Sequence, residues 1–521
     1  MKYKNISTSL ICLLPSIFII PVLINFVYNF NIGGLNLLSS FLNAAIKPDI
    51  SDIVLESTIK GLRTTFSIAF ISWIISIIIG LILGLLSSKL YLSNYNSNNL
   101  ITSNIIRFFL IPRAIHEMIW ALVLQSVFGL SPLIAILAIT IPYSFNFAKI
   151  ISGQIDNLDI KPLISLKSNG ANNLLAILTF TIPKMTSTII SHAAYRFECA
   201  LRGATLLGVF GLGGIGTELE LTLRSLKFNE LWTSIWALWL MMFIVENLVN
   251  FIQRNLKNYQ LKPINIMTVT FVASIIFITS LNTISQTHLD LTIGIDNFDS
   301  LRIDIGSIID GYNSLPILRL TTITLIITFF TSIISLSMPP LMLLTFQNKN
   351  INRVFSTIWS LMRIVPTPLS ALLLLLCSHA NLAIAIISLS IHNIGIMGRA
   401  LKEGIDNQQS SLFDSFISCG ISERKSWLYG KLSLEANKYL AYASYRTEVI
   451  MKETSVLGVI GGSGLGWQLR ESLSSFAWGE VFMVIITYII IFMLWEKISN
   501  KVQNIFIGLK SPEKSPYSMS T

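Results

Sequence analysis

The chain has 521 residues, of which 52% are hydrophobic and 12% charged, and its formal net charge is +10. Soluble chains carry about 25% charged residues, so this chain has too little charge to cover a water-exposed surface around so much apolar mass. The mean hydropathy of +0.67 agrees. These values exclude a soluble globular enzyme and a disordered protein, and they indicate an integral membrane protein surrounded by lipid.

The basic residues stand singly between apolar runs and form no stripe or cluster. The positive net charge therefore indicates orientation in a membrane, and no nucleic-acid partner is predicted. The four cysteines lie far apart, in or beside apolar stretches, and the five histidines lack metal-ligand spacing. Neither a disulfide framework nor a metal site is predicted.

Apolar runs along the chain are each long enough to cross about 30 Å of hydrocarbon at about 1.5 Å per helical residue. The first run follows Lys2 and Lys4, contains two prolines and exceeds the apolar core of a signal peptide, so we expect it to be retained as a helix. The predicted fold class is an all-α integral membrane protein with about twelve transmembrane helices. They lie near 10–30, 64–88, 106–128, 132–151, 185–207, 231–252, 263–282, 318–345, 357–378, 380–400, 437–458 and 479–497.

The orientation of these spans follows from the loops. Most of the Lys and Arg residues left in the loops fall in segments that are cytoplasmic if the N-terminus is inside. Positive charge accumulates on the cytoplasmic side of membrane proteins. The sequence therefore predicts a multi-pass protein with both termini in the cytoplasm.

The chain repeats itself at an offset of 250 residues. Residues 195–225 and 445–475 share 12 identities in 31 ungapped positions, where chance gives about 2. Each copy holds six predicted spans, an even number, so the two halves enter the membrane in the same sense. We therefore predict two parallel six-helix units, residues 1–257 and 258–521, with a substrate path between them.

A long cytoplasmic segment joins the fourth and fifth spans of each half. It contains Gly170 followed by Ala171 in the first half, and Gly420 followed by Ile421 in the second. Glycine lets the backbone turn sharply between two short helices, and the downstream Pro183 suits the first turn of the next helix. The pattern predicts a projecting element suited to docking a cytoplasmic partner; an ordinary loop is the alternative.

These segments resemble the EAA loop of ABC importer permeases. The stretch that follows, YRFE at 195–198 and LGVFGLGGIG at 207–216, is similar to the phosphonate-transport permeases. The resemblance covers both halves, so the chain resembles two such permeases fused in tandem. It implies a place in the bacterial inner membrane, a cytoplasmic ABC ATPase dimer that holds ATP and Mg, and a periplasmic phosphonate-type binding protein. It implies no cofactor in this chain.

The second copy departs from the first at two places. Ser433 stands where the first copy has Pro183, and residues 452–454 (KET) replace residues 202–204 (RGA). We therefore expect the second loop to dock its ATPase differently and the two halves of the path to contribute unequally.

The fifth span of each half carries charged residues, which are costly in a bilayer and usually face a cavity or a partner. Glu198 and Arg202 are spaced i, i+4, as are Glu448 and Lys452. The acid precedes the base in both pairs, which is the favourable orientation on a helix. We interpret these four residues as structural ion pairs.

Arg196 and Arg446 also recur in the repeat, but neither has an acid three or four residues away. A guanidinium beside a transport path could bind an oxyanion substrate through two hydrogen bonds. The alternatives are snorkelling, or pairing with Glu117 or another helix. Three further arginines are weaker candidates for the path: Arg107, Arg113 and Arg363.

A glycine-rich turn follows the fifth span of each half. In the first half it matches GxGxxG, but the dinucleotide fingerprint needs a preceding strand, and here an apolar helix precedes it. We predict instead a tight turn or gate near the outer mouth of the path. No GxxxxGK[ST] motif occurs, so ATP binding by this chain is not predicted. The turn residues are Gly211, Gly213, Gly214, Gly216, Gly461, Gly464 and Gly466.

The resulting hypothesis is the permease component of an ATP-driven ABC importer for phosphonate or a related phosphorus oxyanion such as phosphite or phosphate. It is not itself an enzyme. Two alternatives stay open, an ATP-independent secondary anion transporter and an ABC permease for another small solute. An intramembrane enzyme would need paired acids, a metal site or a nucleophile with its base, and the sequence shows none of these.

Overall fold

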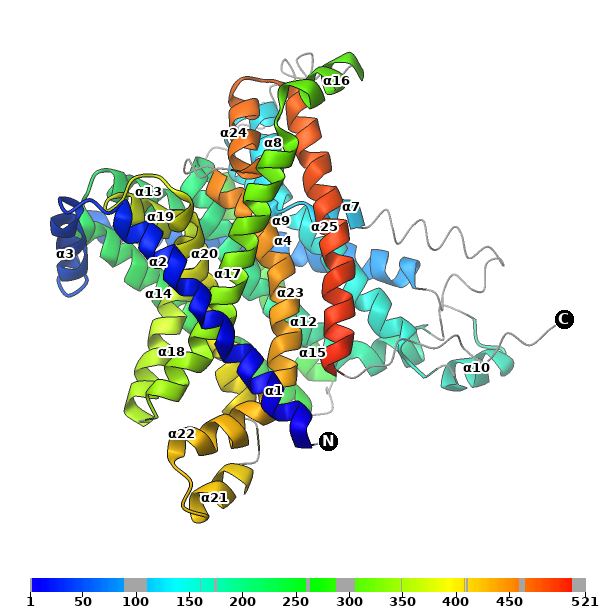
Figure 1. The fold of residues 1–521 in the computed structure, drawn as a ribbon. Coiled ribbons are helices and arrows are strands. Elements are labelled where there is room, and N and C mark those ends of the chain that lie inside the picture. Colours follow the sequence, from blue (N-terminus) through cyan, green and yellow to red (C-terminus); the bar gives the residue numbers. More distant parts are fainter. Residues whose placement is uncertain are drawn as a thin grey trace. The chain divides into compact units, whose positions relative to one another are not determined.

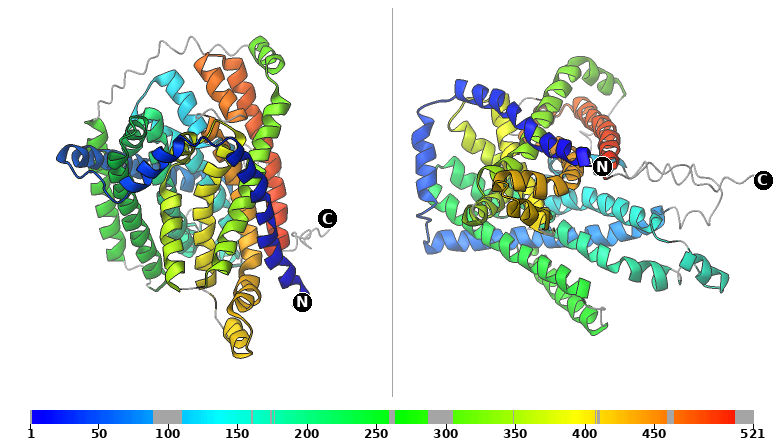
Figure 2. Two further views of the ribbon diagram at one scale, coloured as in Figure 1. Left: turned by 60° about the vertical axis from the view of Figure 1, so that its left-hand side comes forward. Right: turned by 60° about the horizontal axis from the view of Figure 1, so that its bottom comes forward.

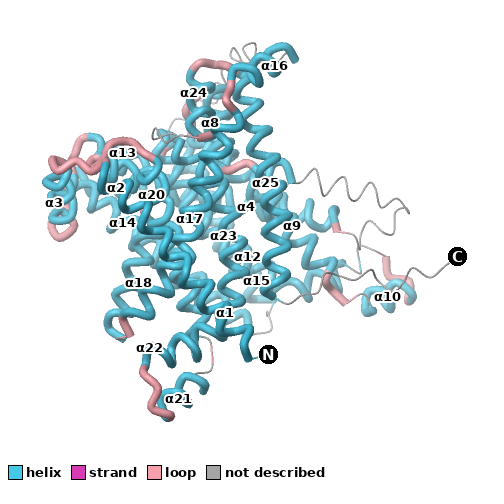
Figure 3. Tube along the Cα trace, viewed as in Figure 1, coloured by secondary structure: helices cyan, strands magenta, loops and turns pink. Residues whose placement is uncertain are grey.

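The structure is a computed structural model that describes residues 2–88, 110–159, 161–172, 175, 177–258, 263–286, 305–347, 349–406, 408, 411–458 and 464–507. Every regular element in these ranges is a helix (Figure 3). The helices form two compact units. We call Phe41–Arg302 the central unit, and Met1–Ser40 with Ile303–Thr521 the terminal unit. The division falls within α3 (Gly34–Ala44).

The central unit is built around three long helices that pack on one another, α4, α9 and α12 (Figure 1). Shorter helices and two π-helical turns, η2 and η3, join them. The elements are α4 (Asp52–Ser87), α7 (Leu110–Ala114), α8 (Glu117–Phe128), α9 (Pro132–Asp156), α10 (Lys161–Ser168), η2 (Ile177–Thr181), α12 (Ile182–Leu207), η3 (Gly208–Leu212), α13 (Ile215–Arg224), α14 (Phe228–Asn258) and α15 (Pro263–Ser285).

Glycines let α4 and α9 approach closely. A Cβ atom at Gly80 would lie 2.8 Å from the Cβ of Phe147, and one at Gly84 would lie 2.8 Å from the Cβ of Ile151. Gly80 and Gly84 are one helical turn apart, and both are buried. Small residues at this spacing let helix backbones meet where lipid supplies no hydrophobic driving force.

The terminal unit contains the N-terminal helices together with the second half of the chain. Its helices α17, α20 and α23 pack on one another, and α25 packs on α23. The elements are α1 (Lys2–Leu13), η1 (Leu14–Phe18), α2 (Ile19–Tyr28), α16 (Ile305–Ser314), α17 (Ile317–Thr345), α18 (Lys349–Ile364), α19 (Thr367–Leu375), α20 (Leu382–Asp406), α21 (Ser411–Ser418), α22 (Glu423–Ser426), η5 (Trp427–Leu432), α23 (Ser433–Leu457), α24 (Leu465–Ser474) and α25 (Trp478–Ile507).

The first predicted span packs on helices from the far end of the sequence. Helix α1 contacts α17 and α23, and α2 contacts α20 (Figures 1 and 2). The Phe18 ring meets the rings of Phe329 and Phe330, each with centroids 6.3 Å away. The compact units therefore differ from the two halves predicted from the repeat. The boundary at 257–258 concerns the repeat and stays a prediction.

The elements of the two halves correspond at the predicted offset. Helices α9 and α20 both have 25 residues and start 250 positions apart, as do the 10-residue helices α13 and α24. Leu226 and Phe476 are also 250 positions apart, and they adopt unusual positive φ angles of 57° and 54°. The similarity found in the sequence thus extends to the backbone.

Among the described residues, 7 helices are long and apolar enough to cross a membrane, or up to 9 if each bent helix pair is one span. This supports the all-helical membrane fold, and the count of twelve stays a prediction. Helix α23 coincides with the predicted span at 437–458. It is not among these 7 helices, because it carries too many charged residues.

The continuous helix predicted at 357–378 is interrupted. Helices α18 and α19 meet at an angle of 94°. Pro366 lies between them, with φ −58° and ψ 140°. A proline lacks the N–H needed inside a helix and pushes the preceding residue, here Val365, out of the helical region. The break therefore follows from local backbone chemistry.

Substitution of Gly84 tests the close contact between α4 and α9. We expect Gly84→Leu to lower the free energy of unfolding by about 1–3 kcal/mol, because the added side chain enters a packed contact. Thermal unfolding of the purified chain measures this. Gly153→Leu on α9 is the control, because no described atom lies within 4 Å of the Cβ position there. Equal unfolding temperatures for the two variants would contradict the contact.

Candidate functional site

Matching glycine turns follow the short helices α10 and α21. Gly170 and Gly420 have φ angles of +86° and +77°. The N–H groups of Ala171 and Ile421 each donate to the carbonyl five residues earlier, at 3.1 Å in both. This is the Schellman arrangement, in which glycine adopts the left-handed conformation just after a helix. The turn chemistry predicted from the sequence is present in both halves.

Both turns are presented away from the body of their unit. No described atom lies within 4 Å of a Cβ position at Gly170 or Gly420, and both glycines are exposed. In the terminal unit, α21 and α22 project beyond the ends of α17 and α25 (Figures 1 and 2). The geometry suits a contact made by the turn rather than packing within the chain.

The return from each turn begins differently. In the central unit Pro183 occupies the first turn of α12, directly after the π-helical turn η2. In the terminal unit α23 begins at Ser433, whose hydroxyl donates to the carbonyl of Tyr429. The replacement of Pro183 by Ser433 in the second copy therefore changes the residue at the start of the fifth-span helix.

A buried acid that was not predicted as a site residue lies in the first turn of α23. Glu435 is 7% exposed, and its carboxylate accepts from the side-chain amide of Gln408 at 2.6 Å. At an offset of 250 the first half has Met185 and Leu158, which belong to an apolar cluster. The sequence could have indicated Glu435, because an acid in the second copy aligns there with a methionine in the first. The root of the loop is thus polar in one half and apolar in the other.

Arg446 belongs to a buried polar network between α20 and α23. Its Nε donates to the side-chain oxygen of Asn393 at 2.7 Å, and its guanidinium bonds Glu453 at 2.6 Å. Asn393 also donates to Glu453 at 2.9 Å. The Arg446 and Glu453 side chains are 8% and 12% exposed. Glu453 lies seven residues after Arg446 on the same helix, beyond the three- or four-residue spacing of an ordinary intrahelical pair.

Arg196, the matching arginine in the central unit, lies against an aromatic ring. Its guanidinium carbon is 5.3 Å from the centroid of Tyr143, a distance typical of cation–π contacts. The Tyr143 hydroxyl donates to Glu117 at 3.4 Å and to the carbonyl of Cys199 at 3.3 Å. Arg196 is half-buried. The structure thus places Glu117, an alternative partner in the sequence analysis, on the same tyrosine as Arg196.

The two predicted ion pairs have different surroundings. Arg202 donates to the carboxylate of Glu198, and this side-chain pair is mostly buried. Lys452 instead places its ammonium nitrogen 4.1 Å from the ring centroid of Phe492. Glu448 is 6% exposed. An ammonium group over an aromatic face is stabilised by the ring quadrupole, so the second half holds its cation partly by an aromatic contact.

The weaker arginine candidates occupy matching places. Arg113 and Arg363 lie 250 residues apart, each in the last turn of a helix, α7 and α18, and each is 4% exposed. A cation in the last turn is favoured by the helix dipole. Arg107 and Gly461 lie outside the described residues.

The glycine-rich turns cap the helices that follow them. Gly211, Gly213, Gly214 and Gly464 have φ angles of +84°, +94°, +93° and +111°. The first N–H of α13 donates to the Thr65 hydroxyl at 2.8 Å, and that of α24 donates to the Thr324 hydroxyl at 3.1 Å. Because the N–H groups at a helix start lack partners within the helix, these hydroxyls satisfy them.

The same turns bring two backbones into contact. A Cβ atom at Gly216 would lie 2.1 Å from the Thr205 carbonyl oxygen, and one at Gly466 would lie 2.8 Å from the Ser455 carbonyl oxygen. The helical segment Thr188–Leu212 meets α13 at 54°. Glycine is required at these positions by close packing, which agrees with a tight turn.

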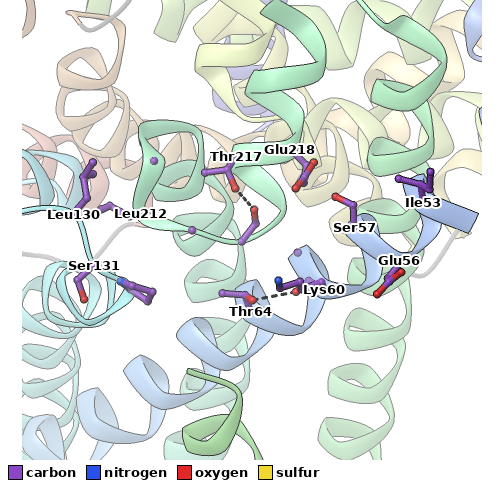
Figure 4. A pocket seen from close by; sticks show the side chains of 15 residues that line it. Ile53, Glu56, Ser57, Lys60, Thr64, Leu130, Ser131, Leu212, Thr217 and Glu218 are labelled. Atoms are coloured by element: carbon purple, nitrogen blue, oxygen red, sulfur yellow. Dashed lines mark hydrogen bonds between the residues drawn. The ribbon is translucent and has the colours of Figure 1, made fainter. Parts of the chain in front are cut away.

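A cavity of about 590 Å³ lies beside the turn of the central unit (Figure 4). The first turns of α4 and the starts of α9 and α13 line it. Its charged residues are Glu56, Lys60 and Glu218. Because α4, α9 and α12 are membrane-length helices, the cavity lies at their ends and not at mid-span. Within the described part of the chain, no three His, Cys, Asp or Glu residues gather as metal ligands.

Comparison with known proteins identifies relatives that are transport permeases. HtxC of Stutzerimonas stutzeri, a phosphite transport system permease protein, is 30% identical over 217 residues, covering 41% of this chain and 74% of that protein. PhnE2 of Escherichia coli, a cryptic phosphonate transport system permease, is 29% identical over 123 residues, covering 24% of this chain and 98% of that protein. No protein-family model matches the chain.

A third relative spans both halves. The phosphate-import permease PhnE of Mycolicibacterium smegmatis is 20% identical over 415 residues, covering 75% of this chain and 76% of that protein. This alignment is longer than either predicted half, so it crosses the boundary at 257–258. The solved structure of the MetNI methionine ABC transporter in inward-facing conformations covers 40% of this chain and 99% of its own, with 16% identity and a TM-score of 0.34.

The helical membrane fold and these relatives define the chain as a transport permease component. The chain belongs to the family of phosphite, phosphonate and phosphate transport permeases of ABC transporters. The resemblance inferred from the glycine-rich stretch is thereby confirmed.

The buried network around Arg446 generates a stability prediction. We expect Arg446→Gln to cost about 3–5 kcal/mol, because it leaves Glu453 buried without its cation. The double variant with Glu453→Gln should recover most of this loss. Thermal unfolding and abundance in the membrane measure both.

Arg224→Gln is the control for this series, because Arg224 forms a 2.8 Å pair with Glu220 while its side chain is 67% exposed. Exposed pairs contribute about 0–1 kcal/mol. An Arg446→Gln variant as stable as Arg224→Gln would show that the network adds little.

Proposed function

We propose that the chain forms the membrane-spanning part of an ATP-driven importer for phosphonate or a related phosphorus oxyanion, phosphite or phosphate. Its relatives are transport permeases named for these three substrates. The observation that carries the ATP-driven part is the pair of matching glycine turns, each exposed and each ending a short helix. A secondary transporter has no use for two such projections.

The proposed cytoplasmic partner is an ABC ATPase dimer, one ATPase under each turn. ATP and Mg would bind to those ATPases. The proposed outer partner is a periplasmic phosphonate-type binding protein that delivers the substrate. We further propose that the chain crosses the bacterial inner membrane about twelve times as two parallel six-helix units, with both termini in the cytoplasm.

Helix α12 connects the two functional ends within the central unit. It starts at Ile182, directly after η2 and twelve residues after Gly170, and it ends at Leu207, where η3 begins the glycine-rich turn. Its 26 residues span about 39 Å at about 1.5 Å per residue. A displacement at the turn near Gly170 would therefore be transmitted as a rigid-body movement to the opposite face of the membrane, where the glycine-rich turn is the proposed gate.

The arginines differ in their suitability for the substrate path. Arg446 already bonds Asn393 and Glu453, so a substrate would have to replace an internal carboxylate there. Arg196 is half-buried and contacts the Tyr143 ring by its face. We propose Arg196 as the better-placed of the repeated pair, with Arg107 and Arg113 as further candidates.

Purification of the tagged chain from its native membranes, with mass spectrometry of the proteins that accompany it, tests the proposal. We expect a stoichiometric ATPase, and a binding protein that can be titrated with phosphonate, phosphite and phosphate. Anion transport by the chain alone in liposomes without ATP would contradict the proposal and establish a secondary transporter. Binding of another solute only would keep the importer and change its substrate.

Substitution of the glycine turns tests their coupling role. We expect Gly170→Leu and Gly420→Leu to reduce ATP-driven uptake, because leucine at positive φ costs about 1–2 kcal/mol and reshapes the turn. Insertion into the membrane should be unchanged, since the added side chain meets open space. Uptake in membrane vesicles, with membrane abundance in parallel, measures this.

Asparagine tolerates the left-handed conformation. Gly420→Asn is therefore the matched control, and it should retain more uptake than Gly420→Leu. Normal uptake in both leucine variants would refute a role of the turns in coupling.

A further inference from the structure

The two repeated arginines have different polar surroundings. In the terminal unit the acid is Glu453, on the same helix as Arg446. The position 250 residues before Glu453 is Gly203, and the position 250 residues before Asn393 is Tyr143. The first half therefore lacks the acid at the matching place, although it keeps the arginine.

The space left by Gly203 is occupied from another helix. A Cβ atom at Gly203 would lie 3.5 Å from a carboxylate oxygen of Glu117 and 3.6 Å from the Tyr143 hydroxyl. Glu117 is the first residue of α8. The residue 250 positions after it is Thr367, which starts α19 and has no charge. Each half thus has one acid for these two positions, and the two halves use opposite positions.

We infer that Glu117 is the functional counterpart of Glu453, the carboxylate that completes the arginine centre of the first half. One of its carboxylate oxygens accepts from the hydroxyl of Tyr143, which stands at the Asn393 position, at 3.4 Å, and the Arg196 guanidinium lies over the face of that tyrosine. At these aligned positions each half has one arginine and one carboxylate, and Glu117 also lies 3.6 Å from His116. A charge buried in a membrane is tolerated when it is paired in this way.

The different position of the acid changes which helices the arginine centre of each half connects. In the terminal unit the bonds among Arg446, Glu453 and Asn393 link α20 and α23, because Arg446 and Glu453 share a helix. In the central unit it links α8, α9 and α12, through Glu117, Tyr143 and Arg196. Glu117 is therefore a positioning residue that ties the start of α8 to the helix carrying Arg196. We expect no equivalent tie of α19 through this centre.

Relocation of the acid tests the inference in the full-length chain. We expect Glu117→Thr to reduce membrane abundance at least about threefold and to lower the unfolding temperature by several degrees, since a destabilised membrane protein is degraded. Gly203→Glu alone should also be destabilising, because it adds a second carboxylate to an occupied place. The double variant, Glu117→Thr with Gly203→Glu, should restore both values to near those of the natural chain.

The terminal unit offers the reverse experiment. Glu453→Ala should be destabilising, and Thr367→Glu in addition should restore the unfolding temperature. Glu117→Gln separates charge from size, and we expect it to behave like Glu117→Thr. Losses that add in the double variants, or a Glu117→Gln variant as stable as the natural chain, would overturn the inference.

Hydrogen exchange separates the contact of α8 from general stability, because the double variant should regain stability without an acid on α8. Amide exchange in α8 should rise in Glu117→Thr and stay high in the relocated double variant, because the acid no longer resides on α8. Recovery of α8 protection in the double variant would argue against the tie. None of these measurements involves substrate, ATPase or binding protein, so their failure is distinguishable from failure of the proposed function.

Discussion

A charge inside a bilayer must find its counter-charge within the protein, because the surrounding lipid supplies none. This requirement explains the polar architecture of both units. Arg446 bonds Glu453 and Asn393, and Arg202 pairs with Glu198. Lys452 lies over the face of Phe492. The fifth helix of each half can therefore carry several charges through a membrane fold. Removing one partner costs more than the pair contributes, since the remaining charge stays buried.

Close backbone contact is the second requirement, and glycine meets it. Gly80 and Gly84 bring α4 against α9, and Gly216 brings the start of α13 against the end of α12. Contacts between backbones leave few side-chain torsions to absorb movement. Helices joined in this way move as rigid bodies. The coupling proposed through α12 relies on this rigidity.

Local backbone chemistry was the part of this structure that could be predicted from sequence. The turns at Gly170 and Gly420 and the offset of 250 between matching helices follow from residue type and spacing. The break at Pro366 is equally local, but a continuous apolar run concealed it. Partners of the buried charges were less accessible. Glu453 lies seven residues from Arg446, and Glu117 reaches its tyrosine from another helix, so only tertiary packing identifies them.

Comparison of the two halves separates what the fold requires from what each half has changed. The backbone features agree, including the positive φ angles at Leu226 and Phe476 and the threonine caps of α13 and α24. The polar side chains differ, since Met185 corresponds to Glu435 and Tyr143 to Asn393. In a fused chain each half is under separate constraint, so an acid can change position in one half only. In the proposed importer, coupling to two ATPases would use the backbone features of both halves, whereas binding of one small substrate would not need two identical linings. The unequal polar centres are therefore compatible with one transport cycle driven from two similar turns.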